Sequence, residues 1–571
     1  MTKTPNEFLQ QAFEPLADRE LEILRSCGTE RPTAPGQVLF QSGDRDYPLF
    51  VVQAGRLRII DRSFGLDRVL RESGPGEFMG ELGLLTGQTV FLNCEVVEGG
   101  SVLEIPAPKL RKLIRTIPEL ADRIVTAFAA RREYLMETAA ATLKLIGSRD
   151  CGPALSLREF LDRNRIPHIW VDRDDPDVAQ WLPHYEPLAP ALQSGARVVA
   201  IVRGGLILSE PTTQELAGAL GLELSWRQDR PADVLVIGTG PAGMAAAVYG
   251  ASEGLDTLAL DDVAIGGQAG TSSRIENYLG FPNGISGGDL AFRGQVQAVK
   301  FGARITVPRC AEKLERDGDG YAVTLTDGKQ LRGRSVVIAT GARYRRLGLA
   351  RQEEFEGAGI YYAATNLESR LCEGQPVVVV GGGNSAGQAA MFLARTAECV
   401  HLLYRGADLR SSMSEYLVNR LEYNPNVEIR TGTQVRELRG NGHLSSTVIT
   451  GPDGREEELP TGAMFVMIGA DPCTSWLRGT LDLDEKGFIV TGAGAPDGAI
   501  PSPFATSLPG VFAVGDVRSG SVKRVASAVG EGSVVVQAIH SYLGTLDPVP
   551  GQEPANRRSA RDRSEQQVAA D

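Results

Sequence analysis

A glycine-rich turn near the middle of the chain has the residue types and the spacing needed to hold a diphosphate. It follows a short apolar stretch at 234–237, precedes a run of small residues at 244–248, and has the spacing G-x-G-x-x-G. The first glycine permits a tight turn, the second lets a diphosphate approach the backbone, and the third lets the helix pack closely on the strand. The helix N-terminus then faces the phosphates. The predicted dinucleotide contacts are Gly238, Gly240, Pro241, Ala242 and Gly243.

An acidic residue and a second glycine turn extend this prediction. Asp261 follows the apolar stretch 257–260, about 20 positions after the first turn, where an acid holds a ribose hydroxyl. After the apolar stretch 376–380 the pattern returns with G-x-G-x-x-A spacing. Two such turns predict two dinucleotides, an arrangement suited to hydride transfer from a nicotinamide to a flavin. The predicted contacts of the second turn are Gly381, Gly383, Asn384, Ser385 and Ala386.

Length, charge and cysteine content exclude several classes of protein. The chain has 571 residues, enough for roughly three or four domains, and its net charge of -12 argues against general nucleic-acid binding. No apolar run reaches the roughly 18 residues of a membrane span, and residues 1–10 are polar. We therefore expect no membrane segment, no signal peptide and a cytoplasmic protein. None of the seven cysteines forms C-x-x-C, so neither a metal site nor a disulfide framework is predicted.

The elements that must position these turns indicate a multidomain fold. Short apolar stretches separated by glycines predict an N-terminal β-barrel, and apolar residues at helical spacing over 110–145 predict a long helix broken near Pro118. A small α/β unit and two Rossmann-type α/β domains follow. The barrel strands are predicted at 37–40, 49–53, 56–60, 68–71 and 101–105. The predicted boundaries are 1–145 for the barrel and helix, 146–225 for the small unit, 231–345 and 471–546 for the two parts of the first α/β domain, 346–470 for the second, and 547–571 for a disordered tail.

The barrel region is similar to a cyclic-nucleotide-binding domain. The similarity rests on the segments 43–44, 50–55 and 74–82, the last of which contains a Gly-Glu-Leu turn. In that family the glutamate of this turn, here Glu81, holds the ribose hydroxyl, and an arginine further along pairs with the cyclic phosphate. The arginine position falls on or near Val90. Valine cannot supply the planar cation that a phosphate needs, which argues against cyclic-nucleotide binding. The alternative is a docking or dimerisation module whose helix packs on a partner.

The small unit resembles a thioredoxin or glutaredoxin fold in the order of its elements. The resemblance places a C-x-x-C where the first strand meets the first helix, but the loop 148–154 keeps only Cys151. A helix N-terminus can lower the pKa of a thiol, so one interpretation is a monothiol relay and the other is a docking domain. Strands are predicted at 143–146, 168–171, 198–202 and 206–208, and helices at 154–163 and 212–220.

From 233 to 545 the chain resembles thioredoxin reductase, the small two-domain flavoprotein type of the pyridine nucleotide-disulfide oxidoreductases (class II). The motifs that carry the resemblance are 266–268, 275–282, the Ala-Thr-Gly turn at 339–341 and the return strand at 510–516. The resemblance implies FAD on the first domain, with Asp516 on the ribityl chain and the following helix directed at the flavin. The implied FAD contacts are Gly267, Gln268, Asn277, Ala339, Thr340, Gly341, Gly515, Asp516, Arg524 and Val525.

The choice between NADPH and NADH is read at the end of the strand after the second turn. The stretch 400–405 ends without an acid, which argues against a strict NADH site. The related reductases hold the NADPH phosphate with arginines, and Arg405 and Arg410 keep two of those positions. The resemblance therefore implies NADPH, and NADH stays an open alternative.

The redox-active cysteines of thioredoxin reductase are absent from this sequence. Ala363 and Asn366 stand at the two positions of its Cys-Ala-Thr-Cys, so the ordinary dithiol relay cannot run. Cys372 is the nearest thiol in sequence and is predicted to be a buried structural cysteine. Tyr361 and Tyr362 either shield the flavin or stack a substrate, or they pack in the core.

These residues support two functions from different classes. The first is an NADPH-dependent FAD oxidoreductase that passes electrons to a disulfide, a quinone, a redox protein or oxygen. No catalytic side chain is assigned, because the cofactors carry the chemistry. The second is a flavin- and NADPH-binding redox sensor with little turnover, and a degenerate scaffold is a third reading. The resemblance and the long amphipathic helix also predict a homodimer.

Overall fold

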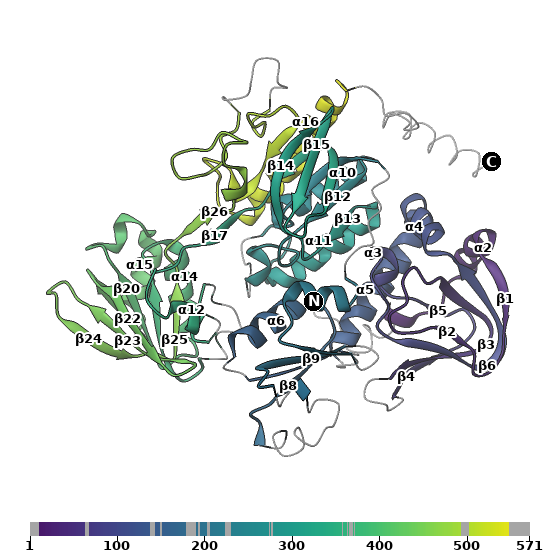
Figure 1. Ribbon diagram of the computed structural model, residues 1–571, viewed down its shortest axis with the longest axis horizontal. Coiled ribbons are helices and arrows are strands. Elements are labelled where there is room, and N and C mark those ends of the chain that lie inside the picture. The colour runs from purple at the N-terminus through teal and green to yellow at the C-terminus, as the bar shows by residue number, and fades with distance from the viewer. Residues whose placement is uncertain are drawn as a thin grey trace.

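The computed structural model describes residues 11–62, 68–137, 143–148, 151–176, 178, 190–191, 194–202, 206–222, 230–272, 275, 278–356, 358–362, 364, 369, 372–492 and 502–546. Four sequence predictions, for Asn277, Ala363, Asn366 and the tail 547–571, lie outside these residues. In Figure 1 the N-terminal barrel lies at the right and the small α/β unit at the bottom centre. The first α/β domain lies above that unit, and the second lies at the left.

The barrel is an antiparallel sheet of order β1-β6-β3-β4, with β2 on β6 and β5 on β3. The prediction of two separate strands at 49–53 and 56–60 is wrong, because both belong to β3 (Leu49–Asp61). The chain passes Gly55 as a bulge instead of a turn. Gly55 has a φ of +86°, and a Cβ there would lie 2.4 Å from the Glu98 carbonyl oxygen. The other strands are β1 (Thr29–Thr33), β2 (Val38–Phe40), β4 (Arg68–Ser73), β5 (Phe78–Met79) and β6 (Asn93–Ile105).

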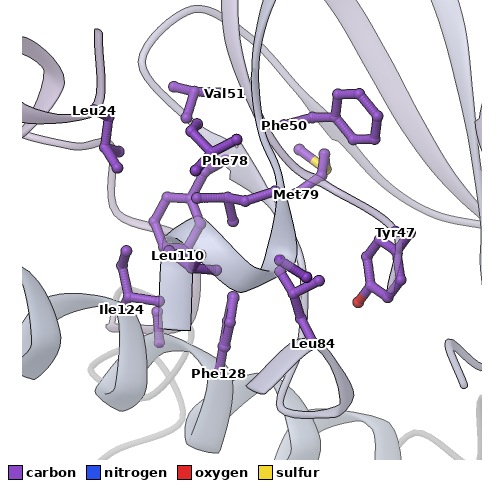
Figure 2. Close-up of a cluster of buried hydrophobic side chains, with 14 of the residues drawn as sticks. Leu24, Tyr47, Phe50, Val51, Phe78, Met79, Leu84, Leu110, Ile124 and Phe128 are labelled. Atoms are coloured by element: carbon purple, nitrogen blue, oxygen red, sulfur yellow. The ribbon is translucent and has the colours of Figure 1, made fainter. Parts of the chain in front are cut away.

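The helices of the N-terminal domain cover the barrel with their apolar faces. The predicted break near Pro118 is confirmed, because α4 (Ala107–Thr116) ends and α5 (Pro118–Glu137) begins there. Ile124 and Phe128 of α5 pack into the barrel core, and the ring of Phe128 lies 6.1 Å from that of Phe78 (Figure 2). The apolar face of α5 is therefore covered within the chain, which does not support its packing on a partner. Two further helices among the described residues are α2 (Asp18–Cys27) and α3 (Gly83–Thr86).

The small unit has the strand order β10-β9-β7-β8. Its first strand, β7, is parallel to β8 and antiparallel to β9, and β9 is antiparallel to β10. This is the arrangement that the predicted thioredoxin-like order requires. The strands are β7 (Lys144–Gly147), β8 (Ile169–Asp172), β9 (Val198–Val202) and β10 (Leu206–Ser209), and the helices include α6 (Gly152–Arg163) and α9 (Thr213–Ala219).

The first α/β domain is built on the sheet β13-β12-β11-β16-β15-β14, with β27 on β16. The central strand β11 is buried at every residue and is parallel to both neighbours, as a continuous apolar strand between helical layers should be. Helices α10 (Pro241–Ser252) and α16 (Val525–Leu543) pack so closely that a Cβ on Gly532 would lie 2.0 Å from the Ala242 carbonyl oxygen. The strands are β11 (Ala232–Ile237), β12 (Thr257–Leu260), β13 (Arg304–Thr306), β14 (Ala311–Asp317), β15 (Gly320–Leu325), β16 (Gln330–Ile338) and β27 (Val511–Ala513), and α11 (Gly287–Phe301) completes the helices.

The second α/β domain has a parallel sheet of order β18-β25-β19-β20-β21 and a separate three-stranded sheet, β22-β23-β24. A two-stranded ribbon of β17 (Ala342–Tyr344) and β26 (Ala470–Pro472) joins it to the first domain. In the described part of the chain, no helix is both long and apolar enough to cross a bilayer. The strands are β18 (Ile360–Tyr361), β19 (Pro376–Val380), β20 (Cys399–Tyr404), β21 (Val427–Thr431), β22 (Gln434–Gly440), β23 (Leu444–Thr450), β24 (Glu456–Pro460) and β25 (Ala463–Val466), and the helices are α12 (Gln352–Phe355), α14 (Asn384–Leu393) and α15 (Glu415–Glu422).

Candidate functional site

A cleft of about 2230 Å³ lies between the two α/β domains, and both glycine turns open into it. A pocket for a single ligand usually measures about 300–1,000 Å³, so this cleft has room for two dinucleotides. The predicted contacts that the structure describes all line the cleft, with four exceptions. The exceptions are Gly243, Asn384, Ala386 and Arg410.

The first glycine turn has the shape that a diphosphate requires. Gly238 has a φ of +99°, and a Cβ there would lie 2.3 Å from the Ala339 carbonyl oxygen. A Cβ on Gly243 would lie 1.9 Å from the Gly238 carbonyl oxygen, so Gly243 acts by letting α10 pack on β11 instead of lining the cleft. Helix α10 begins directly after Gly240, and its N-terminal N–H groups face the cleft. These residues therefore fit the diphosphate of FAD.

The loop that contains Gly267 closes the other side of this turn. Gly267 has a φ of +54°, and a Cβ there would lie 2.9 Å from the Cα of Gly240. The side-chain amide of Gln268 donates to the Ala342 carbonyl oxygen, which ties the loop to the start of the connecting ribbon. The two loops are thus held against each other beside the space for a diphosphate.

Asp261 lies where predicted, at the end of β12, but its carboxylate already has partners. One oxygen accepts from the backbone N and the hydroxyl of Thr239, at 2.7 and 2.9 Å. The other accepts from the backbone N of Val263 and Ala264, at 3.2 and 3.3 Å. These donors fill the acceptor capacity of a carboxylate, and burial raises its pKa. Asp261 therefore holds the turn at Thr239, and a ribose hydroxyl would have to displace one of these donors.

The return segment brings a carboxylate and a helix N-terminus to the cleft. Asp516 follows β27, lines the cleft, and has a pKa that burial raises. The backbone N of Gly515 donates to Glu531 at 2.6 Å, which fixes the segment on α16. Arg524 is the N-cap of α16, and it lines the cleft together with Val525, the first residue of the helix. The positive end of this helix dipole therefore lies at the flavin side of the cleft.

The second glycine turn is shaped in the same way. Gly381 has a φ of +150°, and a Cβ there would lie 2.3 Å from the Met467 carbonyl oxygen. Ala386 is buried beneath Gly381, and the side chain of Asn384 accepts from the backbone N of Ser414 at 2.8 Å. Ala386 therefore packs beneath the turn, whereas Asn384 is exposed and ties the start of α14 to Ser414.

The structure brings only one of the two predicted arginines to the cleft. Arg405 lines it at the end of β20. The guanidinium of Arg410 instead forms a two-pronged ion pair with Glu422 of α15, with both N–O distances 3.0 Å, and also donates to Asn419. Arg410 is therefore held by Glu422 outside the cleft lining, and its predicted contact with the nicotinamide nucleotide stays a prediction.

Comparison with known families agrees with this two-nucleotide cleft. The family described as pyridine nucleotide-disulphide oxidoreductase matches residues 232–532. The chain belongs to this oxidoreductase family. The cyclic nucleotide-binding domain family matches residues 30–117, in the barrel. The oxidoreductases related to this chain use FAD and NADPH, and the chain is an FAD-dependent NAD(P)H oxidoreductase.

Relatives of this oxidoreductase cover mainly its C-terminal part. A thioredoxin reductase of Listeria innocua is 34% identical over 316 residues, which are 55% of this chain and 94% of that protein. An NADPH-dependent thioredoxin reductase 3 of Arabidopsis thaliana is 33% identical over 60% of this chain and 65% of that protein. The crystal structure of Lactococcus lactis thioredoxin reductase, in the FR conformation, superposes with a TM-score of 0.50 and 29% identity, over 55% of this chain and all of that one.

An aromatic pair, Tyr344 and Tyr362, lies in the wall of the oxidoreductase cleft. The sequence predictions included Tyr362 but not Tyr344. The rings of Tyr344 and Tyr362 stack with centroids 5.9 Å apart and planes 7° apart. The Tyr362 hydroxyl donates to Glu356 at 2.5 Å and accepts from Gln352 at 2.8 Å. Burial raises the pKa of both tyrosines. Tyr362 thus lines the cleft. Tyr344 could have been predicted as a cleft residue from its position just after the Ala-Thr-Gly turn.

The two cysteines of interest lie outside the cleft wall formed by the described residues. Cys372 is only 1% exposed, and its Sγ lies 3.7 Å from the Ser369 carbonyl oxygen, which confirms that it is buried. Cys151 is the N-cap of α6 and is partly exposed. Neither thiol is therefore placed to exchange electrons with a flavin in this conformation.

In the N-terminal domain, the carboxylate that the resemblance assigns to a ribose is paired internally. Glu81 accepts from Arg132 of α5 at 2.5 Å and from the backbone N of Gly83 at 2.7 Å. Both Glu81 and Arg132 are buried. A residue of the chain itself thus occupies the side of Glu81 that the resemblance leaves for a ligand.

The position of the missing phosphate arginine lies in the barrel core, next to a contact with the small unit. Val90 is buried, and the hydroxyl of the neighbouring Thr89 donates to the Leu220 carbonyl oxygen at 2.6 Å. A cavity of about 70 Å³ remains in the barrel, well below the about 300 Å³ of the smallest usual ligand pockets. The contact between Thr89 and Leu220 joins the barrel to the small unit.

Proposed function

We propose that this chain is an NADPH-dependent FAD oxidoreductase of thioredoxin reductase type, and that its acceptor is not a dithiol on its own flavin module. The observation that carries the proposal is the single cleft lined by Gly240 and Asp516 on one side and by Gly383 and Arg405 on the other. When bound, the nicotinamide supplies a hydride and the flavin passes electrons on. The residues of the chain orient the two dinucleotides and exclude water from the space between them.

The acceptor in this proposal is a disulfide, a quinone or a redox protein. The similarity to thioredoxin reductases favours a disulfide. Because Ala363 and Asn366 replace the cysteine pair, that disulfide would meet the flavin directly. Tyr344 and Tyr362 give the cleft an aromatic wall, which equally suits a planar quinone.

Anaerobic mixing of the purified flavoprotein with NADPH, and separately with NADH, tests this function. The visible flavin absorption should bleach rapidly with NADPH and more slowly with NADH. The rate of reoxidation by a soluble quinone, a small disulfide and thioredoxin then ranks the acceptors. A bound flavin that stays oxidised with both nucleotides would rule out the oxidoreductase function.

Two cysteine variants serve as controls in the same experiment. Cys151→Ser and Cys372→Ser should bleach and reoxidise at the wild-type rate, because neither thiol lines the cleft. Slower reoxidation of Cys151→Ser alone would instead support the monothiol relay.

Arg405 should determine the preference for NADPH. Replacing Arg405 with alanine should raise the KM for NADPH about 10-fold or more, because a charged hydrogen bond to a phosphate contributes about 1.5–3 kcal/mol. The KM for NADH should change little. Arg410→Ala is the matched control and should have a smaller effect, because Glu422 already holds that guanidinium. An unchanged KM for NADPH in Arg405→Ala would contradict the assignment.

A redox sensor with little turnover is the second candidate. The absence of the cysteine pair and the joining of the barrel to the small unit at Thr89 favour it. We also propose a cytoplasmic homodimer. This proposal rests on the family resemblance alone, because the apolar face of α5 is covered within the chain and no longer supports it. Slow bleaching together with a nucleotide-dependent change in sedimentation would favour the sensor.

A further inference from the structure

One wall of the flavin side of the cleft comes from outside the oxidoreductase module. Helix α6 of the small unit contributes Leu155, Ser156, Glu159 and Arg163 to the cleft lining, although the family match begins only at residue 232. In Figure 1, α6 lies directly below the first α/β domain and beside the second. The small unit therefore takes part in the site itself.

The C-terminal end of α6 is fixed on the FAD-binding domain. The side-chain amide of Asn164 donates to the Val263 carbonyl oxygen at 3.2 Å. Arg165 forms an ion pair with Asp289 and lies over the ring of Phe292, with its Cζ 4.5 Å from the ring centroid. A group at this end of α6 is thus held in a set position relative to the flavin site.

Arg163 is the cation that this end of α6 presents to the cleft. Its Nη2 donates to the Gly267 carbonyl oxygen at 2.8 Å, and its Nη1 pairs with Glu159 at 3.3 Å. The Arg163 side chain is only 18% exposed, whereas that of Glu159 is 55% exposed. A guanidinium carries five N–H groups, so these two bonds leave donors for an anion in the cleft.

The position of Gly267 places this guanidinium beside the diphosphate turn. Gly267 abuts Gly240, the residue at which a diphosphate approaches the backbone. Tyr344 and Asp516 line the same cleft. Arg163 therefore lies beside the diphosphate turn, in the wall of the cleft that Asp516 also lines.

We propose that Arg163 binds the diphosphate of FAD, so that the small α/β unit is a structural part of the flavin site. The planar guanidinium is the side chain best suited to phosphate oxygens, and its partial burial strengthens the interaction. The α10 N-terminus and Arg163 then hold the diphosphate together. In this proposal the small unit acts through the charge and position of Arg163, and not through the thiol of Cys151.

Binding of FAD to the full-length apoprotein tests the proposal without any turnover. Arg163→Gln should weaken FAD about 10- to 100-fold, and Arg163→Lys should fall between it and wild type. The matched control is Arg197→Gln, since Arg197 lies on the same unit, is 66% exposed and pairs only at the surface with Glu210. Arg197→Gln should bind FAD as wild type does.

Binding of two fragments of FAD distinguishes a direct contact between Arg163 and phosphate from a merely structural role of Arg163. Arg163→Gln should lose affinity for ADP, which has the diphosphate, and keep its affinity for adenosine, which has none. An equal loss for ADP and adenosine, or an unchanged affinity for FAD, would overturn the proposal. A circular dichroism spectrum and thermal midpoint confirm that each variant is folded. The readout is binding, so it stays valid if the chain proves to be a sensor.

Discussion

Replacing Gly243 with alanine should abolish FAD binding. The added Cβ would lie 1.9 Å from the Gly238 carbonyl oxygen and 3.1 Å from the Cβ of Ala339, and the nearest atom belongs to rigid backbone. Helix α10 must therefore move away from β11, which costs about 1–3 kcal/mol or more and shifts the N–H groups that face the diphosphate. The purified variant should be colourless, and its FAD affinity should fall at least about 100-fold by fluorescence titration.

Gly530→Ala is the matched control for this substitution. Gly530 lies inside α16, and a Cβ there would meet no atom within 4 Å. Alanine at an open helical position stabilises the helix by up to about 1 kcal/mol, so this variant should stay yellow and melt at or above the wild-type temperature. Normal flavin content in Gly243→Ala would show that the strand and helix can separate without damage to the site.

Replacing Arg132 with leucine should destabilise the N-terminal domain by about 3–5 kcal/mol. Glu81 is 7% exposed and would be left in the protein interior without its charged partner. The variant would also lose the contact of the guanidinium with the ring of Phe91, whose centroid lies 5.1 Å from the Arg132 Cζ. Chemical denaturation followed by the signal of this domain measures the free energy of unfolding.

The double variant Glu81→Leu with Arg132→Leu gives the internal control. It removes both buried charges, so it should recover most of the stability that the single variant loses. Arg56→Leu is the surface control, because the Arg56–Glu72 pair is 49% and 44% exposed and should contribute at most about 1 kcal/mol. A single Arg132 variant within about 1 kcal/mol of wild type would show that Glu81 finds another partner or takes up a proton.

The predictions that depended on local pattern were the most accurate. The strand before Gly238, the helix after it and the break at Pro118 all appear in the structure, because each depends on backbone sterics among neighbouring residues. Gly55 shows the limit of such reasoning. A glycine with positive φ suits a turn or a bulge equally, and only the pairing of β3 with β6 selected the bulge.

Pattern says least about side chains that the fold pairs with other residues of the chain, so the predicted roles of Arg410 and Asp261 stay predictions. Arg410 is held by Glu422, the Asp261 carboxylate by Thr239 and its neighbours, and the apolar face of α5 by the barrel. The spacing of residues predicts which residue types lie at a site. It does not predict which carboxylate or carbonyl group binds a given cation in the folded chain.

The sequence by itself predicted two dinucleotide sites, because each glycine turn stands between an apolar strand and a helix. Gly243 meets Gly238 within its own strand–turn–helix unit, whereas Gly238 and Gly381 meet the distant carbonyl oxygens of Ala339 and Met467. It also predicted that the family's ordinary dithiol relay cannot run, since Ala363 and Asn366 stand at its two cysteine positions. Only the tertiary structure decided that Glu81 is satisfied by Arg132 and that Arg163 stands beside the diphosphate turn. The first is a contact within the N-terminal domain and the second joins the small unit to the FAD-binding domain. The geometry of both is set by packing and not by residue spacing.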